Sequence, residues 1–411
     1  MRTKQEQNKV RRRLLYLWFP HFSIERHKRI EIDKRAKQDD FSGIIIIQDR
    51  AGRRVVIASC PLAFQMGVAV GLSLEDALAA CPSLLVFEAD LIADQLAIET
   101  LARWCGRYTP LVSIDKANKG LGNAGIWLDI TGCAHLFGGE ADLLNDIIAR
   151  LTAINWTAFG AISDTPGSAW AVARFSGGVT QLIAPGEQQA ALSELPLSAL
   201  RLPKNTVDDL SKVGLRKISQ LMLVPRAPLR ARFGKNIRLR LDQALGIEKE
   251  TVSPQTLHSP YLARLVLLEP ISNSETIKQI LGHLLPQVIE MLVTRSLGIR
   301  QLRLSLYKID GKVQELKIRT SEVSQNSDVV LRLFSEKIDN YLLDTGVDVV
   351  TLEATETDVI QYKQVYLNNE SETSELKLSE LIDSLTNRFG ISSVTLHSLK
   401  ELSLIHISEP T

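Results

Sequence analysis

Acidic residues are the first candidates for chemistry in this chain, because paired carboxylates can hold catalytic metal ions about 4 Å apart. The first predicted strand, 13–19, and the turn after it contain Trp18 and Pro20 but no acid. Asp115, at the end of a later predicted strand, is followed by the cation Lys116. Tryptophan and proline cannot bind Mg²⁺, and Asp115 has no partner carboxylate. The sequence therefore predicts no metal site and no catalytic residue at these positions.

Basic residues are concentrated in one segment of a chain whose net charge is only +1. Residues 201–250 contain twelve Lys and Arg against five Asp and Glu. Such a segment is typical of a module that contacts nucleic-acid phosphates. A helical surface that is simply solvated is the alternative. The candidate DNA-binding side chains in this segment are Lys204, Lys212, Arg216 and Lys217.

Composition favours a cytoplasmic protein of several domains. The chain has 411 residues, of which 45% are hydrophobic and 23% charged, as in ordinary globular proteins. No apolar run approaches the ~20 residues of a membrane span, and no apolar region with a cleavage site follows the basic N-terminus. The four cysteines lack CxxC spacing, so reduced core thiols are expected rather than a zinc site or disulfides. No cofactor is predicted.

Strands and helices alternate in the first part of the chain, which predicts an α+β domain around Trp18 and Asp115. The strands are expected at 13–19, 43–48, 111–114, 126–130 and 157–162, and the helices at 24–37, 61–71, 73–80, 90–107 and 142–154. A capping box at Ser73 to Asp76 marks the start of one helix.

Residues 196–250 predict short helices with the rhythm of a helix–hairpin–helix between Leu202 and Leu221. In that motif, backbone N–H groups at the hairpin bind a DNA phosphate and glycine permits the close approach. Leu202-Pro203 stands in place of the usual Gly-x-Gly, so the phosphate site is expected to be weakened. A small structural helical domain is the alternative.

A βαββαβ unit is predicted behind a linker. Its strands are expected at 264–268, 299–307, 313–319 and 347–354, its helices at 275–294 and 328–343, and a hairpin turn at Asp310-Gly311. Leucines alternate with polar residues along 302–307, which predicts one buried and one open sheet face. A solvated face is the alternative to a DNA-binding one. The open face is expected to present Arg303, Tyr307, Lys317 and Arg319 to a nucleic-acid backbone.

This order of parts resembles the Y-family translesion DNA polymerases, and within them the ImuB branch, over about residues 13–398. The phrase WLDITGCAHLFGGE at 127–140 is the most specific match, and LWFP at 17–20, YTPLV at 108–112 and DTPGSAW at 164–170 support it. The resemblance implies an α+β multidomain fold with palm, fingers, helix–hairpin–helix thumb and βαββαβ little finger. The implied boundaries are a basic tail at 1–12, UmuC-like palm and fingers at 13–190, the thumb at 191–250, a linker at 251–261, the little finger at 262–356, a polar tail at 357–401 and an end at 402–411 that continues no pattern.

Departures from the active polymerases fall at the residues of their metal and nucleotide sites. The paired carboxylates of their first strand fall at Trp18 and Pro20, and their Asp-Glu pair falls at Asp115-Lys116. Their triphosphate contacts fall near Pro61 and Phe64 in the fingers and near Pro166 in the palm. Losing both kinds of contact together implies a non-catalytic homologue and not an enzyme. An active polymerase with a rearranged metal site, using Asp115 with Asp129 or Asp49, is one alternative.

The resemblance implies a DNA-binding adaptor in bacterial SOS-induced translesion synthesis and mutagenesis. It would bind primer–template DNA without sequence preference and link the sliding clamp, an error-prone C-family polymerase and a RecA-like ImuA protein. The family's clamp-binding peptide is matched best by Gln364, Tyr366 and Leu367, although Asn368 replaces an expected aromatic residue. An amphipathic helix at 378–389 either docks a partner or packs on the little finger. A purely protein-binding scaffold is the other alternative.

Overall fold

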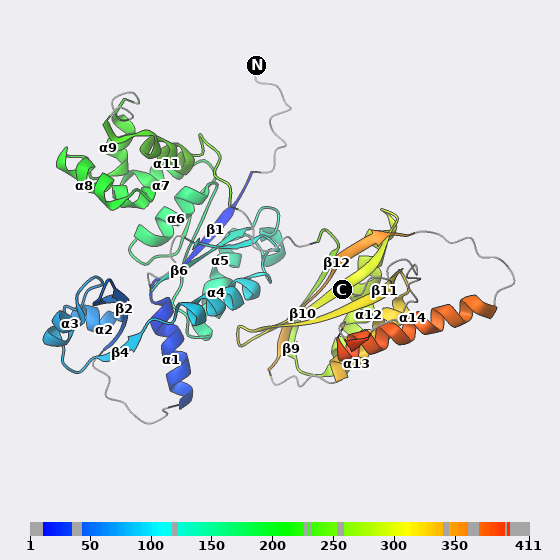
Figure 1. Ribbon diagram of the computed structural model, residues 1–411. Coiled ribbons are helices and arrows are strands. Elements are labelled where there is room, and N and C mark those ends of the chain that lie inside the picture. Colours follow the sequence, from blue (N-terminus) through cyan, green and yellow to red (C-terminus); the bar gives the residue numbers. More distant parts are fainter. Residues whose placement is uncertain are drawn as a thin grey trace, which may run out of the picture. The chain divides into compact units, whose positions relative to one another are not determined.

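The computed structural model describes residues 11–34, 43–116, 122–225, 229, 232–252, 259–339, 345–360, 370–390 and 393–394. The chain divides into two compact units (Figure 1). One comprises Met1–Leu257 with Asp310–Lys312, and the other His258–Ile309 with Val313–Thr411. The finer domain boundaries named above stay predictions. None of the helices in the described ranges is long and apolar enough to span a membrane.

A five-stranded sheet forms the centre of the first unit, with the strand order β5-β6-β1-β7-β8. Its strands are β1 (Leu14–Phe19), β5 (Val112–Ile114), β6 (Ala124–Asp129), β7 (Phe159–Ser163) and β8 (Gln181–Leu182). Strand β1 pairs antiparallel with β6 and β7, so Trp18 lies between Gly125 and Phe159. The four strands that were predicted within this sheet are confirmed.

Helices cover both faces of this sheet, and the alternation along β1 decides which side chain meets which helix. The helices are α4 (Leu91–Cys105), α5 (Glu140–Ala153) and α6 (Pro166–Phe175). Leu15 and Leu17 lie on the α5 side, where they meet Leu144 beside Gly160. Tyr16 belongs instead to the core that α6 shares with Trp127, and Trp18 packs against the same core. Trp18 therefore lies on the sheet face that α6 covers, and the surroundings of Trp18 and Asp115 are found on this face.

A smaller sheet of order β3-β2-β4 follows β1 in the chain. Its strands are β2 (Ile44–Arg50), β3 (Arg53–Ser59) and β4 (Leu85–Glu88), and its neighbouring helices are α1 (Phe22–Lys34), α2 (Pro61–Gln65) and α3 (Leu74–Ala80). The helix predicted over 61–71 ends at Gln65, and β3 and β4 were not predicted. The turn Ala51-Gly52, where both residues have positive φ, was the available signal for the β2–β3 hairpin. The cap at Ser73 is confirmed, since its Oγ accepts a hydrogen bond from the Asp76 N–H at 3.1 Å.

Short helices complete the first unit and share one core with α6. They are α7 (Gln188–Ser193), α8 (Lys204–Lys212), α9 (Ile218–Leu223) and α11 (Lys235–Leu245), with a 3₁₀ turn at Leu197–Leu200. Another 3₁₀ turn, Ala134–Phe137, lies next to α5. Because Tyr16 and Trp127 of the sheet belong to this same core, the helical segment is anchored on the α6 face.

The second unit is the predicted βαββαβ unit, with a four-stranded sheet of order β11-β10-β12-β9. It consists of β9 (Leu262–Ile271), α12 (Ser274–Val293), β10 (Leu297–Lys308), β11 (Val313–Ser324), α13 (Ser327–Asp339) and β12 (Val347–Val359). The alternating leucines of β10 are buried as predicted, in a core with α12 and α13. A further helix, α14 (Glu370–Phe389), lies along β11 and α13.

Candidate functional site

Asp115 follows β5 directly, and side chains on the α6 side of the sheet form hydrogen bonds with its carboxylate. The Asp115 N–H donates to the Gly125 carbonyl at 2.9 Å, which holds the residue beside β6. Its Oδ2 atom accepts hydrogen bonds from the Tyr16 hydroxyl at 2.8 Å and from the Trp170 indole N–H at 3.1 Å. The carboxylate thus accepts from two aromatic side chains, one in β1 and one in α6.

Trp18 lies on the same face, beside a stacked arginine. The guanidinium of Arg174 lies 5.1 Å from the Trp18 ring centroid and 4.7 Å from that of Trp170. Phe159 extends the cluster, with its ring centroid 6.0 Å from that of Trp18. Stacking of this kind stabilises a guanidinium on aromatic faces. A cation and aromatic rings therefore occupy the surroundings of Asp115.

The residues here do not fit a pair of metal ions. Lys116 is exposed, and Pro20 supplies no ligand atom. No cluster of three or more His, Cys, Asp or Glu side chains suited to a metal ion occurs in the described part of the chain. Asp129 does not complete a pair, because it lies four residues along β6 from Gly125, about 13 Å at the usual rise per residue. Its carboxylate instead binds Arg12 at 2.9 Å and the Thr131 hydroxyl at 2.6 Å.

Replacing Asp115 by Ala is expected to cost stability, because two donors in the core under α6 lose their acceptor. The free energy of unfolding should fall by about 1–3 kcal/mol, measured by urea unfolding followed by tryptophan fluorescence. Glu88→Ala, at an exposed position, should change it by at most about 0.5 kcal/mol. Equal values for the two variants would contradict the structural role assigned to Asp115.

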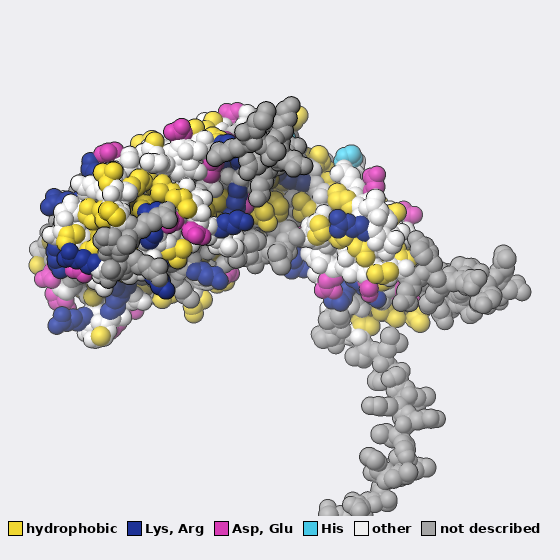
Figure 2. Space-filling model, turned by 90° about the horizontal axis from the view of Figure 1, so that it is seen from above, with side chains coloured by type: hydrophobic (Ala, Val, Ile, Leu, Met, Phe, Trp, Pro, Cys, Tyr) yellow, Lys and Arg dark blue, Asp and Glu magenta, His cyan; other side chains and the backbone are white. Residues whose placement is uncertain are grey.

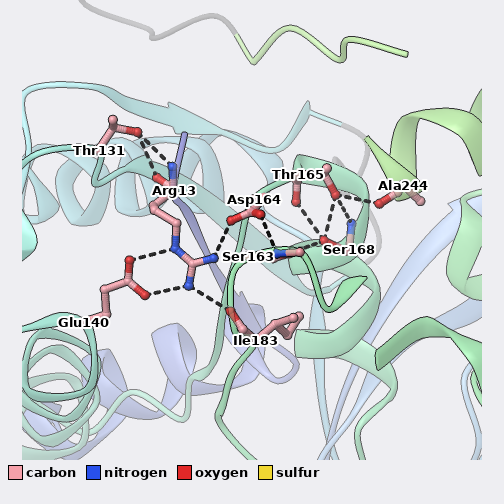
Figure 3. Close-up of polar contacts among 10 residues, drawn as sticks. Arg13, Thr131, Glu140, Ser163, Asp164, Thr165, Ser168, Ile183 and Ala244 are labelled. Carbon is pink, nitrogen blue, oxygen red and sulfur yellow. Dashed lines mark hydrogen bonds and ion pairs between the residues drawn. The ribbon is translucent and has the colours of Figure 1, made fainter. Parts of the chain in front are cut away.

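Arg13 ties the start of β1 to three other parts of the first unit (Figure 3). Its Nε donates to Glu140 at 2.7 Å, its Nη1 to Asp164 at 2.6 Å and its Nη2 to the Ile183 carbonyl at 2.8 Å. Burial by itself lowers the pKa of Arg13, but the two carboxylates outweigh it and the pKa is raised. The buried guanidinium of Arg13 thus links β1 to the start of α5, to the β7–α6 loop and to the segment that follows β8.

The loop at 164–168 also joins the sheet to the helical segment (Figure 3). The Thr165 hydroxyl, which caps α6, donates to the Ala244 carbonyl in α11 at 2.7 Å. A Cβ atom at Gly167 would lie only 2.8 Å from the Ala244 Cα, so only glycine allows this approach. Residues of the DTPGSAW motif at 164–170 therefore hold the sheet, α6 and α11 together.

The four predicted phosphate contacts of the helical segment all lie on its surface, but they differ in their partners. Lys212 pairs with Asp209 at 2.8 Å and Lys217 with Glu194 at 2.6 Å. Lys204, at the start of α8, and Arg216, between α8 and α9, are both exposed. Neither takes part in an ion pair recorded within the described ranges. Their charges are therefore the least neutralised of the four.

The hairpin between α8 and α9 has the predicted geometry, with Gly214 at a φ of +85°. Its amide groups, however, have partners within the protein. The Arg216 and Lys217 N–H groups both donate to Gln220 Oε1, at 2.7 and 3.1 Å. The sequence indicated a weakened phosphate site at Leu202-Pro203, and the Gln220 side chain adds a second reason for it. Any phosphate contact proposed for this hairpin would therefore depend on side chains.

The sheet face of the second unit is less open than expected, and the prediction is wrong for Tyr307. This side chain is only 5% exposed, because it lies between Val313 of β11 and Val349 of β12. Burial raises the pKa of Tyr307 to about 12, against a smaller opposing effect of its hydrogen bond with Thr351. Tyr307 is therefore a packing residue.

The cations predicted to contact DNA on this sheet face lie close to carboxylates. Arg303 lies 3.8 Å from Glu315 and 3.7 Å from Glu353, and Lys317 lies 3.6 Å from Glu315. Arg319, farther along β11, pairs with Glu356 at 2.9 Å. Lys317 and Arg319 are exposed, whereas the Arg303 side chain is 18% exposed. The two β11 cations are thus the accessible ones for a phosphate.

Figure 2 shows one face of the molecule, where Lys and Arg side chains occur in separate places among acidic, hydrophobic and uncharged ones. Within each unit, the basic residues visible on this face form no continuous band. The predicted clamp-binding residues Gln364, Tyr366 and Leu367 lie outside the described residues.

Sequence reasoning missed the partners of Asp115 and the stacking of Arg174. Trp170 and Arg174 lie four residues apart in α6, a spacing that places both on one helix face. That spacing was a usable signal only once the helix had been predicted. All four cysteines are free. Cys60, Cys81 and Cys105 are buried as expected of core thiols, whereas Cys133 is only half-buried.

Comparison with known proteins agrees with the fold and the motifs. The impB/mucB/samB family model matches residues 39–174. Protein ImuB of Caulobacter vibrioides is 36% identical over 330 residues, which are 80% of this chain and 70% of that protein. DNA polymerase IV of Shewanella frigidimarina is 27% identical over 343 residues, 79% of this chain and 92% of that protein.

Among solved structures, a Y-family DNA polymerase chimera based on Dbh is similar in fold, with a TM-score of 0.50 at 13% identity. The match covers 85% of this chain and all of the chimera. The α+β multidomain fold predicted from the sequence, with its βαββαβ unit, is therefore that of the Y-family polymerases.

Proposed function

Because this chain belongs to the ImuB family of Y-family DNA polymerase homologues, we propose that it is a non-catalytic, DNA-binding adaptor. It would act in bacterial SOS-induced translesion synthesis and mutagenesis, in the cytoplasm. The observation that carries this proposal is the hydrogen bonding of Asp115 to Tyr16 and Trp170, beside Trp18 and Arg174. The polymerase framework is retained, while the acid that would bind metal serves the core of the fold.

DNA binding needs cations rather than a metal site, and exposed cations are present in the described residues of both units. We assign the main phosphate contacts to Lys204 and Arg216 in the thumb, with Lys212 and Lys217 as weaker contacts. In the little finger, Lys317 and Arg319 of β11 are the proposed contacts and Arg303 a secondary one. These contacts would follow the DNA backbone without reading its sequence.

The proposed partners of the adaptor are the sliding clamp, an error-prone C-family polymerase and a RecA-like ImuA protein. The family membership supports this assignment. The clamp would bind the peptide with Gln364, Tyr366 and Leu367 in an extended conformation. Active Y-family polymerases extend the primer themselves. This adaptor would not extend it and would hold the primer–template for the C-family polymerase.

Fluorescence anisotropy with labelled primer–template DNA tests the DNA-binding part of the proposal. The four thumb contacts and the two β11 contacts together predict that log K falls with log salt at a slope of about −5, since each phosphate contact contributes about −0.9. Two different DNA sequences should give the same curve.

A purely protein-binding scaffold is the second candidate, and the Gln220 contact at the thumb hairpin favours it. With the Arg216 and Lys217 amides bonded internally, the motif lacks its usual phosphate donors. Absence of DNA binding at 50 mM salt would support the scaffold and overturn the adaptor.

A further inference from the structure

Strand β11 forms one edge of its sheet, and side chains rather than another strand satisfy its outer backbone groups. The Lys337 Nζ donates to the Lys317 carbonyl, and Arg300 donates to the Ser321 carbonyl. Unpaired edge groups invite strand addition from other chains, so such blocking is a general protective device. Three further hydrogen bonds on this edge involve α14.

The side chain of Asn387 in α14 forms the pair of backbone hydrogen bonds that a neighbouring strand would form with Arg319. Its Oδ1 accepts from the Arg319 N–H at 3.0 Å, and its Nδ2 donates to the Arg319 carbonyl at 2.7 Å. A residue in an antiparallel neighbour forms the same two bonds. One turn earlier in the helix, Asp383 Oδ1 accepts from the Ser321 N–H at 2.5 Å. The helix therefore covers the backbone of β11 at Arg319 and Ser321.

The contacts of α14 with β11 are hydrogen bonds, and most of its apolar side chains are exposed, whereas Ile382 is half-buried. Leu378, Leu381, Leu385 and Phe389 are between 36% and 60% exposed, whereas Asp383 is only 6% exposed. A helix is ordinarily held by burying its apolar side chains. Here hydrogen bonds, each of small net value, provide the attachment that the structure describes. Segments held in this way open at low free-energy cost.

Charge gives this arrangement a consequence for DNA binding. From Glu370 to Phe389 the helix contains five acids and two bases. It lies on the strand that carries Lys317 and Arg319, the exposed cations of the little finger. Backbone N–H groups of the kind that Asn387 and Asp383 occupy are donors that commonly contact phosphate.

We propose that α14 is a displaceable cap on a phosphate-binding edge, and that DNA and α14 compete for β11. The incoming phosphates would take the Arg319 and Ser321 N–H groups as α14 leaves. This inference rests on the proposed DNA binding and adds its regulation. A permanent cap that only protects the sheet edge is the alternative outcome.

Asn387→Ala tests the competition without changing charge, because it removes both bonds to Arg319. If the cap is closed in about nine molecules of ten, opening it raises the apparent DNA affinity by at most about tenfold. We expect an increase of about fivefold at 100 mM salt. Thr386→Ala, at the neighbouring position, should leave the affinity unchanged. Asp383→Asn keeps a hydrogen-bond acceptor and removes a negative charge. If this variant raises the DNA affinity about fivefold and Asn387→Ala does not, the effect is simple electrostatics and the cap is overturned.

Hydrogen exchange of the wild-type protein gives a second readout. On binding primer–template DNA, exchange should become faster in 378–390, while the Arg319 and Ser321 amides stay protected. Normal DNA binding with α14 still protected, and no gain from Asn387→Ala, overturns the cap and leaves the adaptor standing. Absence of binding by both proteins overturns the two together, whereas binding by Asn387→Ala alone supports both.

Discussion

Replacing both Lys204 and Arg216 by Glu is expected to lower the affinity for primer–template DNA about 30- to 100-fold at 100 mM salt. Of the four predicted thumb contacts, these are the two without an ion pair recorded within the described ranges. Removing two phosphate contacts should also flatten the salt dependence, so the slope of log K against log salt should change by about 2. Anisotropy titrations between 50 and 300 mM salt measure both quantities.

A control with the same change in net charge separates contact from general repulsion. Arg53 and Arg103 are exposed in the first unit but lie outside the thumb. Changing both to Glu should weaken binding by no more than a few-fold and leave the slope nearly constant. If this control weakens binding as much as the thumb variant, the thumb is not the phosphate-binding surface.

Arg13→Met is expected to have the largest effect on stability, lowering the free energy of unfolding of the first unit by about 3–5 kcal/mol. The variant leaves Glu140 and Asp164 without their shared cation, and their side chains are only 25% and 18% exposed. The Ile183 carbonyl loses its donor as well. Denaturant unfolding followed by circular dichroism measures the loss.

Arg13→Lys provides the matched comparison. Lysine keeps the charge but cannot reach both carboxylates with the planar fork of arginine. We expect a loss of about 1–2 kcal/mol, between wild type and Arg13→Met. If Arg13→Met cost less than about 1 kcal/mol, the buried fork would be incidental to the fold.

The parts that the sequence predicted well depend on local pattern. Leucines at every second position of β10 identified its buried face, and the Asp310-Gly311 pair identified the hairpin between β10 and β11. The spacing around Gly214 identified the α8–α9 hairpin. In each case the signal lies within a few residues of the element that it predicts.

The parts that it missed depend on contacts between distant segments. Asp115 meets Trp170 across 55 positions, and no property of either residue alone indicates that pairing. Tyr307 alternates correctly for an open face, yet its side chain is buried beside its cross-strand neighbours Val313 and Val349. The exposed stripe of α14 was visible in the sequence, but its polar attachment to β11 was not.

Primer extension tests the central claim most directly, because the claim is binding without nucleotidyl transfer. The protein would be incubated with a labelled primer–template, all four dNTPs and Mg²⁺ or Mn²⁺, and DNA binding would be read in the same reaction. We predict a salt-sensitive complex and no extended primer with either metal. Metal-dependent extension that Asp115→Ala abolishes would contradict the account, since it would make Asp115 a metal ligand and the DNA-bound protein a polymerase.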